Sequence, residues 1–194
     1  MALLAGGLLS RFYALNWPRA VVFDEFHFGK FTNGYLTGRY FFDIHPPLGK
    51  LLIATFAGYA GYDASQPFAA IGEPFRAGVD AYTLRVVPAT FGAALVPLSF
   101  LVARELGLSR AAALLVGGLV LLDGALLVES RLLVTEPLLF CFELAQLYCA
   151  LRAARAPPLS RPPAHGWLML TGLSIGAAIS TKWTALATMA VVGA

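Results

Sequence analysis

Charged residues are scarce in this chain of 194 residues: Asp, Glu, Lys and Arg make up 13% of it, against roughly 25% in soluble domains. Hydrophobic residues make up 58%. This balance excludes an ordinary water-soluble domain and predicts an integral membrane protein. The formal net charge of +3 is also too small to predict a nucleic-acid partner.

Cysteine is nearly absent as well. Cys141 and Cys149 lie on one apolar helical pattern, about 12 Å apart along its axis, which is too far for a disulfide. The sequence also lacks a Gly-rich phosphate loop, a dinucleotide fingerprint and a Ser-His-Asp arrangement, which argues against a sugar-nucleotide donor. No three side chains have convincing metal-ligand spacing. We therefore expect no cofactor, and the sequence leaves a dependence on divalent cations unresolved.

Long apolar runs are abundant, and they predict an all-α integral membrane protein. The expected spans are residues 1–15, a short first span whose beginning is missing, and then about 81–104, 111–128, 135–151, 167–181 and 184–194. Residues 16–80 form a long polar and aromatic loop. Because the last apolar run continues to residue 194, we interpret the sequence as the N-terminal part of a longer protein.

Arginines predict the orientation of these spans. They lie in the turn near residue 107 and in the Pro-rich linker that follows the 135–151 span: Arg104, Arg110, Arg152, Arg155 and Arg161. The positive-inside rule assigns both places to the cytoplasm. The 16–80 loop, the 123–136 hairpin tip and the "TKW" break then lie together on the outer, extracytoplasmic face.

Two helical patterns occur within the 16–80 loop. The stretch "EFHFGKFTNGYL" places Phe28, Phe31 and Tyr35 at helical spacing, and "DIHPPLGKLLIATFAGYAGY" gives a second pattern. The Pro-Pro pair suits the first turn of a helix. We predict two amphipathic, juxtamembrane surface helices, which would hold the nearby acidic residues where a lipid-linked substrate presents its headgroup.

Five segments together give the sequence a specific resemblance. They are "FDEFHFGKF", "YFFDIHPPLGKLL", "YTLRVVPATFGA", "LLDGALLVESRLLVTEPLLF" and "STKW". In this order and spacing, from about residue 8 to the end, the chain resembles the protein O-mannosyltransferases, which belong to the GT-C class of polyprenyl-phosphate-sugar-dependent glycosyltransferases. The compact Ala-, Gly- and Arg-rich style is typical of bacteria, so we expect a bacterial plasma membrane as the location.

This resemblance implies a GT-C-type multi-span helical bundle and a membrane enzyme. The implied reaction is inverting transfer of mannose from a polyprenyl-phosphate carrier to Ser or Thr of an exported polypeptide. Such a reaction needs a base for the acceptor hydroxyl and cations for the departing phosphate. The resemblance implies Asp24 as the base, with Glu25 in support. The fragment alone is expected to be inactive.

The resemblance also implies that Arg85 binds the donor phosphate or belongs to the polar network of the site, although an arginine near the start of a span commonly snorkels to the interface instead. Lys182 would be a second donor-site cation if the preceding span ends near Thr181. If residues 167–194 form one span, Lys182 is buried and needs a partner.

Three further polar residues have two interpretations each. Asp43 and His45 either cap and turn the chain into the second surface helix or also border the active site, as the resemblance implies. His27 is either a packed histidine or part of the site. Glu136 stands where the family commonly has an aspartate, and we assign it no catalytic role. At the hairpin tip, Asp123 and Arg131 are expected to form a structural ion pair or network.

Two other functions are consistent with parts of the sequence. A glycosyltransferase of the same class that uses another lipid-linked sugar, or a lipid or glycan acceptor, would share the Pro-Pro-Leu turn. A transporter or scaffold would explain the spans but not the outer acidic residues. Transporters place ionisable groups near the middle of the bilayer, whereas here these groups gather at one edge.

Overall fold

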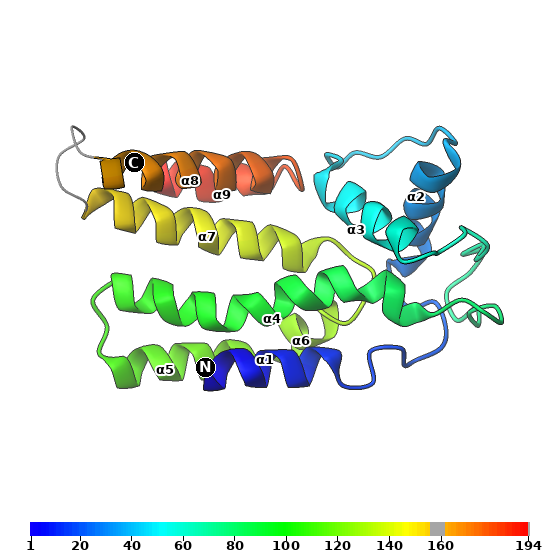
Figure 1. The fold of residues 1–194 in the computed structure, drawn as a ribbon, viewed down its shortest axis with the longest axis horizontal. Helices are drawn as coiled ribbons and strands as arrows, with labels where there is room; N and C mark the ends of the chain where they lie inside the picture. Colours follow the sequence, from blue (N-terminus) through cyan, green and yellow to red (C-terminus); the bar gives the residue numbers. More distant parts are fainter. Residues whose placement is uncertain (156–161, 194) are drawn as a thin grey trace.

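The computed structural model describes residues 1–155 and 162–193, so Arg161 of the predicted cytoplasmic linker lies outside the described part. Over these residues the chain is helical, with one isolated antiparallel bridge between Ala20 and Pro74 (Figure 1). The helices are α1 (Ala2–Phe12), α2 (Glu25–Thr37), α3 (Leu48–Tyr59), α4 (Ala81–Glu105), α5 (Arg110–Leu122), α6 (Gly124–Glu129), α7 (Glu136–Ala154), α8 (Pro162–Ile179) and α9 (Ala185–Gly193). The prediction of an all-α chain is confirmed for this part.

Helices α4 and α7 form the centre of an elongated bundle. Helix α4 packs against α1, α5 and α7, and α7 packs against α8 (Figure 1). Small residues permit the close approach of α1 to α4, because a Cβ atom added at Gly7 would lie 2.8 Å from the carbonyl oxygen of Ala93. Helix α4 continues through Pro88 and Pro97, as expected for prolines inside a bundle.

Among the described helices, α4 and α7 are long and apolar enough to cross a membrane, while α1, α3, α5 and residues 165–179 are shorter apolar helices. The predicted 111–128 span is interrupted. Helix α5 ends at Leu122, and the carboxylate of Asp123 accepts a hydrogen bond of 2.8 Å from the N–H of Leu126 to cap α6. The structure therefore supports two of the predicted spans, α4 and α7, and it shows that residues 111–128 form two helices instead of one span.

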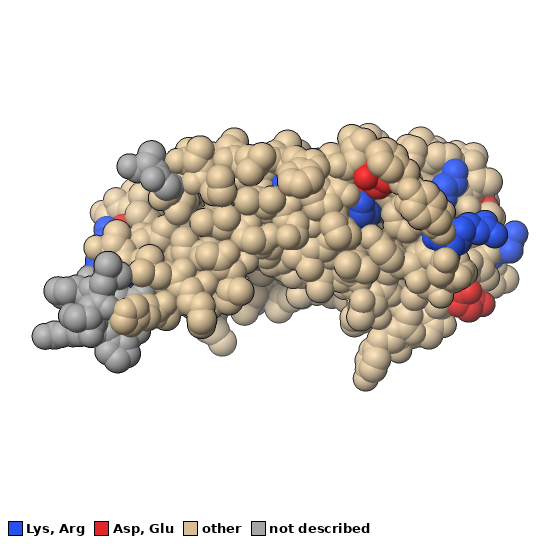
Figure 2. Space-filling model, turned by 90° about the horizontal axis from the view of Figure 1, so that it is seen from above, with Lys and Arg blue, Asp and Glu red and all other residues tan. Residues whose placement is uncertain are grey.

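The outer surface of the bundle is apolar. Leu9 on α1, Leu119 on α5 and Leu173 on α8 are all exposed. On the face drawn in Figure 2, charged side chains gather mainly at the end that carries α2 and α3. A long apolar surface with charges at its end is what contact with lipid requires.

A buried apolar cluster fixes α2 and α3 to this end of the bundle. It joins Phe28 of α2, Ile53 of α3 and Leu84 of α4 to the segment 132–134. Its members also include Phe68, whose ring occupies the space that a Cβ atom at Gly29 would need. The glycine of "FHFGKF" therefore lets the 60–80 loop close over α2.

Candidate active site

A pocket of about 250 Å³ lies where α2, the segment before α3, the start of α7 and the α8–α9 break come together. It is lined by Asp24, His27, Phe28, Phe31, Asp43, Ile44, His45, Glu136 and Lys182. Four distant stretches of sequence thus contribute to one cavity. It contains five of the seven predicted site residues, and the other two, Glu25 and Arg85, do not line it.

Asp24 faces this pocket from the N-terminus of α2. Its backbone carbonyl accepts a hydrogen bond of 3.0 Å from the N–H of Phe28, and its carboxylate makes no capping bond to the helix. Phe23, directly before it, has a φ of 49°, a left-handed conformation that is rare for a bulky residue. This turn brings the chain into α2 with the Asp24 carboxylate free of partners within the helix.

Glu25 is directed away from the pocket and into the protein. It is fully buried, and its carboxylate accepts hydrogen bonds of 2.9 Å from the backbone N–H groups of Val22 and Leu133. Its main partner is Arg85, also fully buried, which donates to it through Nε at 2.7 Å and Nη2 at 2.8 Å. The adjacent acids of "FDEF" therefore have different surroundings.

The remaining donors of Arg85 also face the protein. Nη1 donates to the carbonyls of Leu15 and Pro18, and Nη2 donates to that of Ala20. In this geometry Arg85 is part of a buried hydrogen-bond network, and its donors are directed at the protein rather than at the pocket of Asp24. The arrangement has a physical cause: a buried guanidinium needs nearby acceptors, and Glu25 and the loop after α1 supply them.

Asp43 is held by a lysine that our sequence reasoning did not select. Lys50, buried in the first turn of α3, forms an ion pair with Asp43 and donates a hydrogen bond of 2.8 Å to the carbonyl of His45. Burial by itself raises the pKa of Asp43, but the hydrogen bond and charge of Lys50 and the N–H of His45 lower it, and its pKa lies below its ordinary value. No side chain caps α3, which begins after Pro47, but the turn of "DIHPP" is held by Lys50 and also lines the pocket.

Lys182 lies in the break between α8 and α9. Helix α8 ends at Ile179, so the short-helix alternative is the one observed. The Lys182 Nζ is 2.7 Å from Oε1 of Glu136, and both side chains are about one-fifth exposed, at 22% and 20%. The break is anchored by the Trp183 indole, which donates to the carbonyl of Ile44 at 2.9 Å.

Glu136 is the pocket residue that our sequence reasoning left without a role. The available signal was its place in "SRLLVTEP", where the sequence departs from the pattern implied by the family resemblance. At the hairpin tip Asp123 and Arg131 form no ion pair with each other, and for Arg131 the alternative of a structural network is the one observed. Arg131 instead donates to backbone carbonyls of residues 10–14, while Asp123 caps α6.

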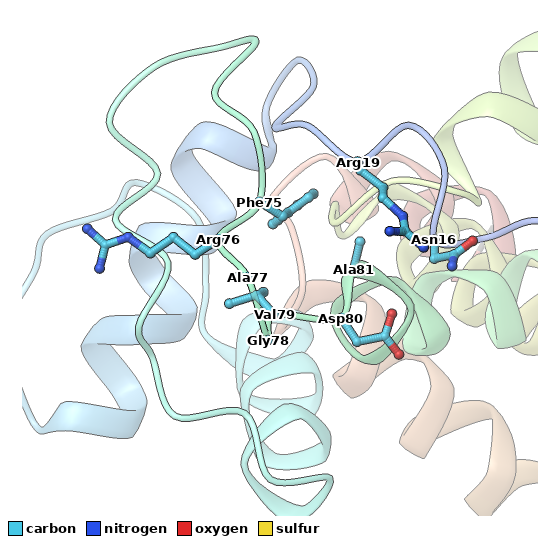
Figure 3. A pocket seen from close by; sticks show the side chains of 9 residues that line it. All are labelled: Asn16, Arg19, Phe75, Arg76, Ala77, Gly78, Val79, Asp80 and Ala81. Atoms are coloured by element: carbon cyan, nitrogen blue, oxygen red, sulfur yellow. The ribbon is translucent and has the colours of Figure 1, made fainter.

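A second, larger pocket of about 460 Å³ lies between the loop after α1 and the start of α4 (Figure 3). It is lined by Asn16, Arg19, Phe75, Arg76, Ala77, Gly78, Val79, Asp80 and Ala81. Two of its charged groups have structural partners: Asp80 caps α4, and Arg76 donates to the carbonyl of Ser65. It shares no lining residue with the pocket of Asp24.

Comparison with known proteins accounts for these motifs. All 194 residues match the family model described as dolichyl-phosphate-mannose-protein mannosyltransferase. The chain belongs to this family. This confirms the resemblance to the protein O-mannosyltransferases that the sequence motifs gave.

Relatives in this mannosyltransferase family come from distant eukaryotes. The chain is 40% identical over 188 residues to dolichyl-phosphate-mannose–protein mannosyltransferase 4 of Schizosaccharomyces pombe, covering 95% of this chain and 24% of that protein. It is 35% identical over 187 residues to protein O-mannosyl-transferase 2 of Danio rerio, with the same two coverages. The chain thus spans about a quarter of the length of these relatives.

A solved structure has the same fold. It is the Saccharomyces cerevisiae protein O-mannosyltransferase Pmt1-Pmt2 complex bound to the sugar donor, which superimposes with a TM-score of 0.93 at 33% identity. The match covers 99% of this chain and 26% of that chain. The helical arrangement described above is therefore that of a membrane O-mannosyltransferase over this region.

Proposed function

We propose that this chain forms the acidic, donor-binding part of a membrane mannosyltransferase. The whole protein would transfer mannose, with inversion, from a polyprenyl-phosphate carrier to Ser or Thr hydroxyls of exported polypeptides. The observation that carries this proposal is the pocket in which Asp24, two histidines and the Lys182–Glu136 pair converge at one end of the apolar bundle. The names of the relatives supply the sugar, the lipid phosphate and the protein acceptor.

Asp24 is the proposed general base. Its carboxylate lines the pocket and is not used to cap α2, so it is available to accept the proton of an acceptor hydroxyl. The oxygen then attacks the anomeric carbon from the side opposite the leaving phosphate, which accounts for inversion. Glu25, held by Arg85, has a positioning role in this scheme because it fixes the start of α2 beneath Asp24.

Lys182 is the proposed partner of the leaving phosphate. Its side chain lines the pocket, and its ammonium group has three N–H donors, one of which bonds to Glu136. A cation at this point offsets the charge that develops on the phosphate as the glycosidic bond breaks. Asp43, His45 and His27 complete the polar wall around the sugar. We further propose that this end of the bundle faces the extracytoplasmic side of a bacterial plasma membrane.

Transfer assays on the full-length protein test this proposal. Membranes that contain it receive radiolabelled polyprenyl-phosphate-mannose and a Ser/Thr-rich peptide. Because loss of a general base costs about 10²- to 10⁴-fold, we expect Asp24→Asn to reduce labelling of the peptide by at least 100-fold. Undiminished labelling by this variant rejects the base assignment.

The matched control is Asp63→Asn, which changes an exposed aspartate in the same 16–80 loop and outside the pocket. We expect it to label the peptide like the wild type. Parallel assays with other lipid-linked sugars and with lipid acceptors distinguish the proposed reaction from that of another GT-C glycosyltransferase. Labelling of a lipid but not of the peptide would replace the proposed acceptor.

A further inference from the structure

Two polar atoms in the pocket of Asp24 have no partner among the described residues. They are Oε2 of Glu136 and Nδ1 of His45, and both atoms are buried. The other oxygen of the Glu136 carboxylate is held by Lys182. A buried polar atom without a hydrogen-bond partner is costly, so two such atoms in one open pocket indicate that a ligand supplies the missing hydrogen bonds.

The chemistry of the two atoms restricts that ligand. An ionised carboxylate only accepts hydrogen bonds, whereas an imidazole nitrogen accepts or donates according to its tautomer. An alcohol hydroxyl satisfies both atoms, because it donates and accepts. A phosphate would bring its negative charge against Glu136, and a peptide carbonyl has no proton to donate. A hydroxyl-bearing ligand therefore fits both atoms with a single group.

We propose that Glu136 Oε2 and His45 Nδ1 hydrogen-bond hydroxyls of the lipid-linked sugar and thereby select which sugar the site accepts. This inference rests on the proposed function. Lys182, the proposed partner of the donor phosphate, lies 2.7 Å from the other Glu136 oxygen, and the sugar is bonded directly to that phosphate. The sugar rather than the acceptor is thus the source of hydroxyls nearest to Glu136.

Deoxy-sugar donors test this selection in the full-length protein. The probes are polyprenyl-phosphate-mannose and its four analogues that each lack one hydroxyl of the sugar. A hydrogen bond to a charged group discriminates by roughly 10- to 100-fold, so we expect the wild type to use at least one analogue that much less well, as kcat/KM. In Glu136→Ala the ratio of kcat/KM for polyprenyl-phosphate-mannose to kcat/KM for that analogue is at least tenfold smaller than in the wild type. The ratio compares two donors in one preparation, so the amount of folded enzyme does not affect it.

Glu129→Ala is the matched control, since it removes a carboxylate of the same type that is close to Glu136 but outside the pocket. It is expected to keep the wild-type ratio. The inference is overturned if the wild type does not discriminate among the donors, or if Glu136→Ala discriminates as the wild type does. It is also overturned if Glu136→Ala changes only the KM of the peptide, because the hydroxyl would then belong to the acceptor.

A binding measurement separates failure of this inference from failure of the proposed function. Each donor is added to purified protein and the shift in Tm is measured for the wild type, Glu136→Ala and Glu136→Gln. In the wild type, the mannose donor should raise Tm more than one of the deoxy analogues does, and in the Glu136 variants this difference should be absent. That result supports sugar contact even if no mannose is transferred. Equal shifts in all three proteins reject it.

Discussion

At the scale of single residues, the two acids of "FDEF" have opposite environments. Asp24 lines an open pocket, whereas Glu25 is completely buried and bound to Arg85. Adjacent residues at the start of a helix point in directions about 100° apart, so one can face a cavity while the other faces the core. The buried pair is a structural feature of the site, and it gives Arg85 a role in the fold that does not involve phosphate binding.

Arg85→Met should therefore destabilise the protein. Removing one member of a buried ion pair leaves an uncompensated charge and costs about 3–5 kcal/mol. We expect a lower Tm for the purified full-length variant, and a smaller loss in the double variant Glu25→Gln/Arg85→Met than the sum of the two single losses. An unchanged Tm together with lost affinity for the lipid-phosphate donor would instead restore Arg85 as a phosphate ligand.

The Asp43–Lys50 pair predicts a dependence of stability on pH. The pKa of Asp43 in the folded protein is lower than its ordinary value, so its contribution to stability is complete above the unfolded pKa and is lost as pH falls through the folded pKa. We expect Tm to fall below about pH 4. In Asp43→Asn this part of the decrease is absent, and an unaltered pH profile in that variant would contradict the assignment.

At the scale of elements, the break between α8 and α9 brings Lys182 to the pocket. Two bonds dock it on the start of α3 and the segment before it: Trp183 Nε1 donates to the carbonyl of Ile44, and the N–H of Leu48 donates to the carbonyl of Ser180 at 2.8 Å. The position of the lysine thus depends on contacts between segments far apart in sequence, in addition to the bond of its own N–H to the carbonyl of Ala178 in α8.

Trp183→Phe removes one of these bonds while it keeps an aromatic ring. The loss of a hydrogen bond costs about 1 kcal/mol, so we expect KM for the lipid-linked donor to rise about fivefold as Lys182 loses its fixed position, with a smaller change in kcat. Trp17→Phe, at an exposed tryptophan that does not line the pocket, is the control. Equal donor KM values for both variants would show that the docking bond does not position Lys182.

At the scale of the whole molecule, the polar site and the Arg-rich turn lie at opposite ends of the apolar bundle. Figure 1 shows α2 and α3 at one end and the α4–α5 turn at the other. At that turn Arg152 and Arg155 form ion pairs with Glu105. Helix α4 connects the two ends over 25 residues, about 37 Å at 1.5 Å per residue, which is enough to cross a bilayer.

This arrangement predicts the membrane topology. In full-length protein with Cys141 and Cys149 replaced by serine, a cysteine at Asp63 should react in intact cells with a maleimide that does not cross membranes. A cysteine at Leu106, an exposed residue in the α4–α5 turn, should react only after the cells are lysed. The reverse pattern would place the pocket of Asp24 in the cytoplasm and contradict the proposed orientation.

Much of this protein could be predicted from local sequence. The scarcity of charge indicated a membrane protein, helical periodicity predicted α2, α3 and α4 to within a few residues, and "FDEFHFGKF" with "FFDIHPPLGKLL" identified the family. These features depend on composition, on a 3.6-residue period and on short motifs, and none of these requires contacts between distant parts of the chain. The break at Asp123 was missed because its capping bond competes with an apolar pattern that continues through it.

Only the tertiary structure decided which polar side chains face the pocket. Glu25 and Arg85 are 60 residues apart in sequence, and Glu136 and Lys182 are 46 apart, so neither pairing follows from any local period. Burial decided the outcome in the first pair, because a guanidinium inside the protein must find a carboxylate and carbonyls. In the second pair, the end of α8 brought a lysine beside the start of α7, and so placed Glu136 in the site.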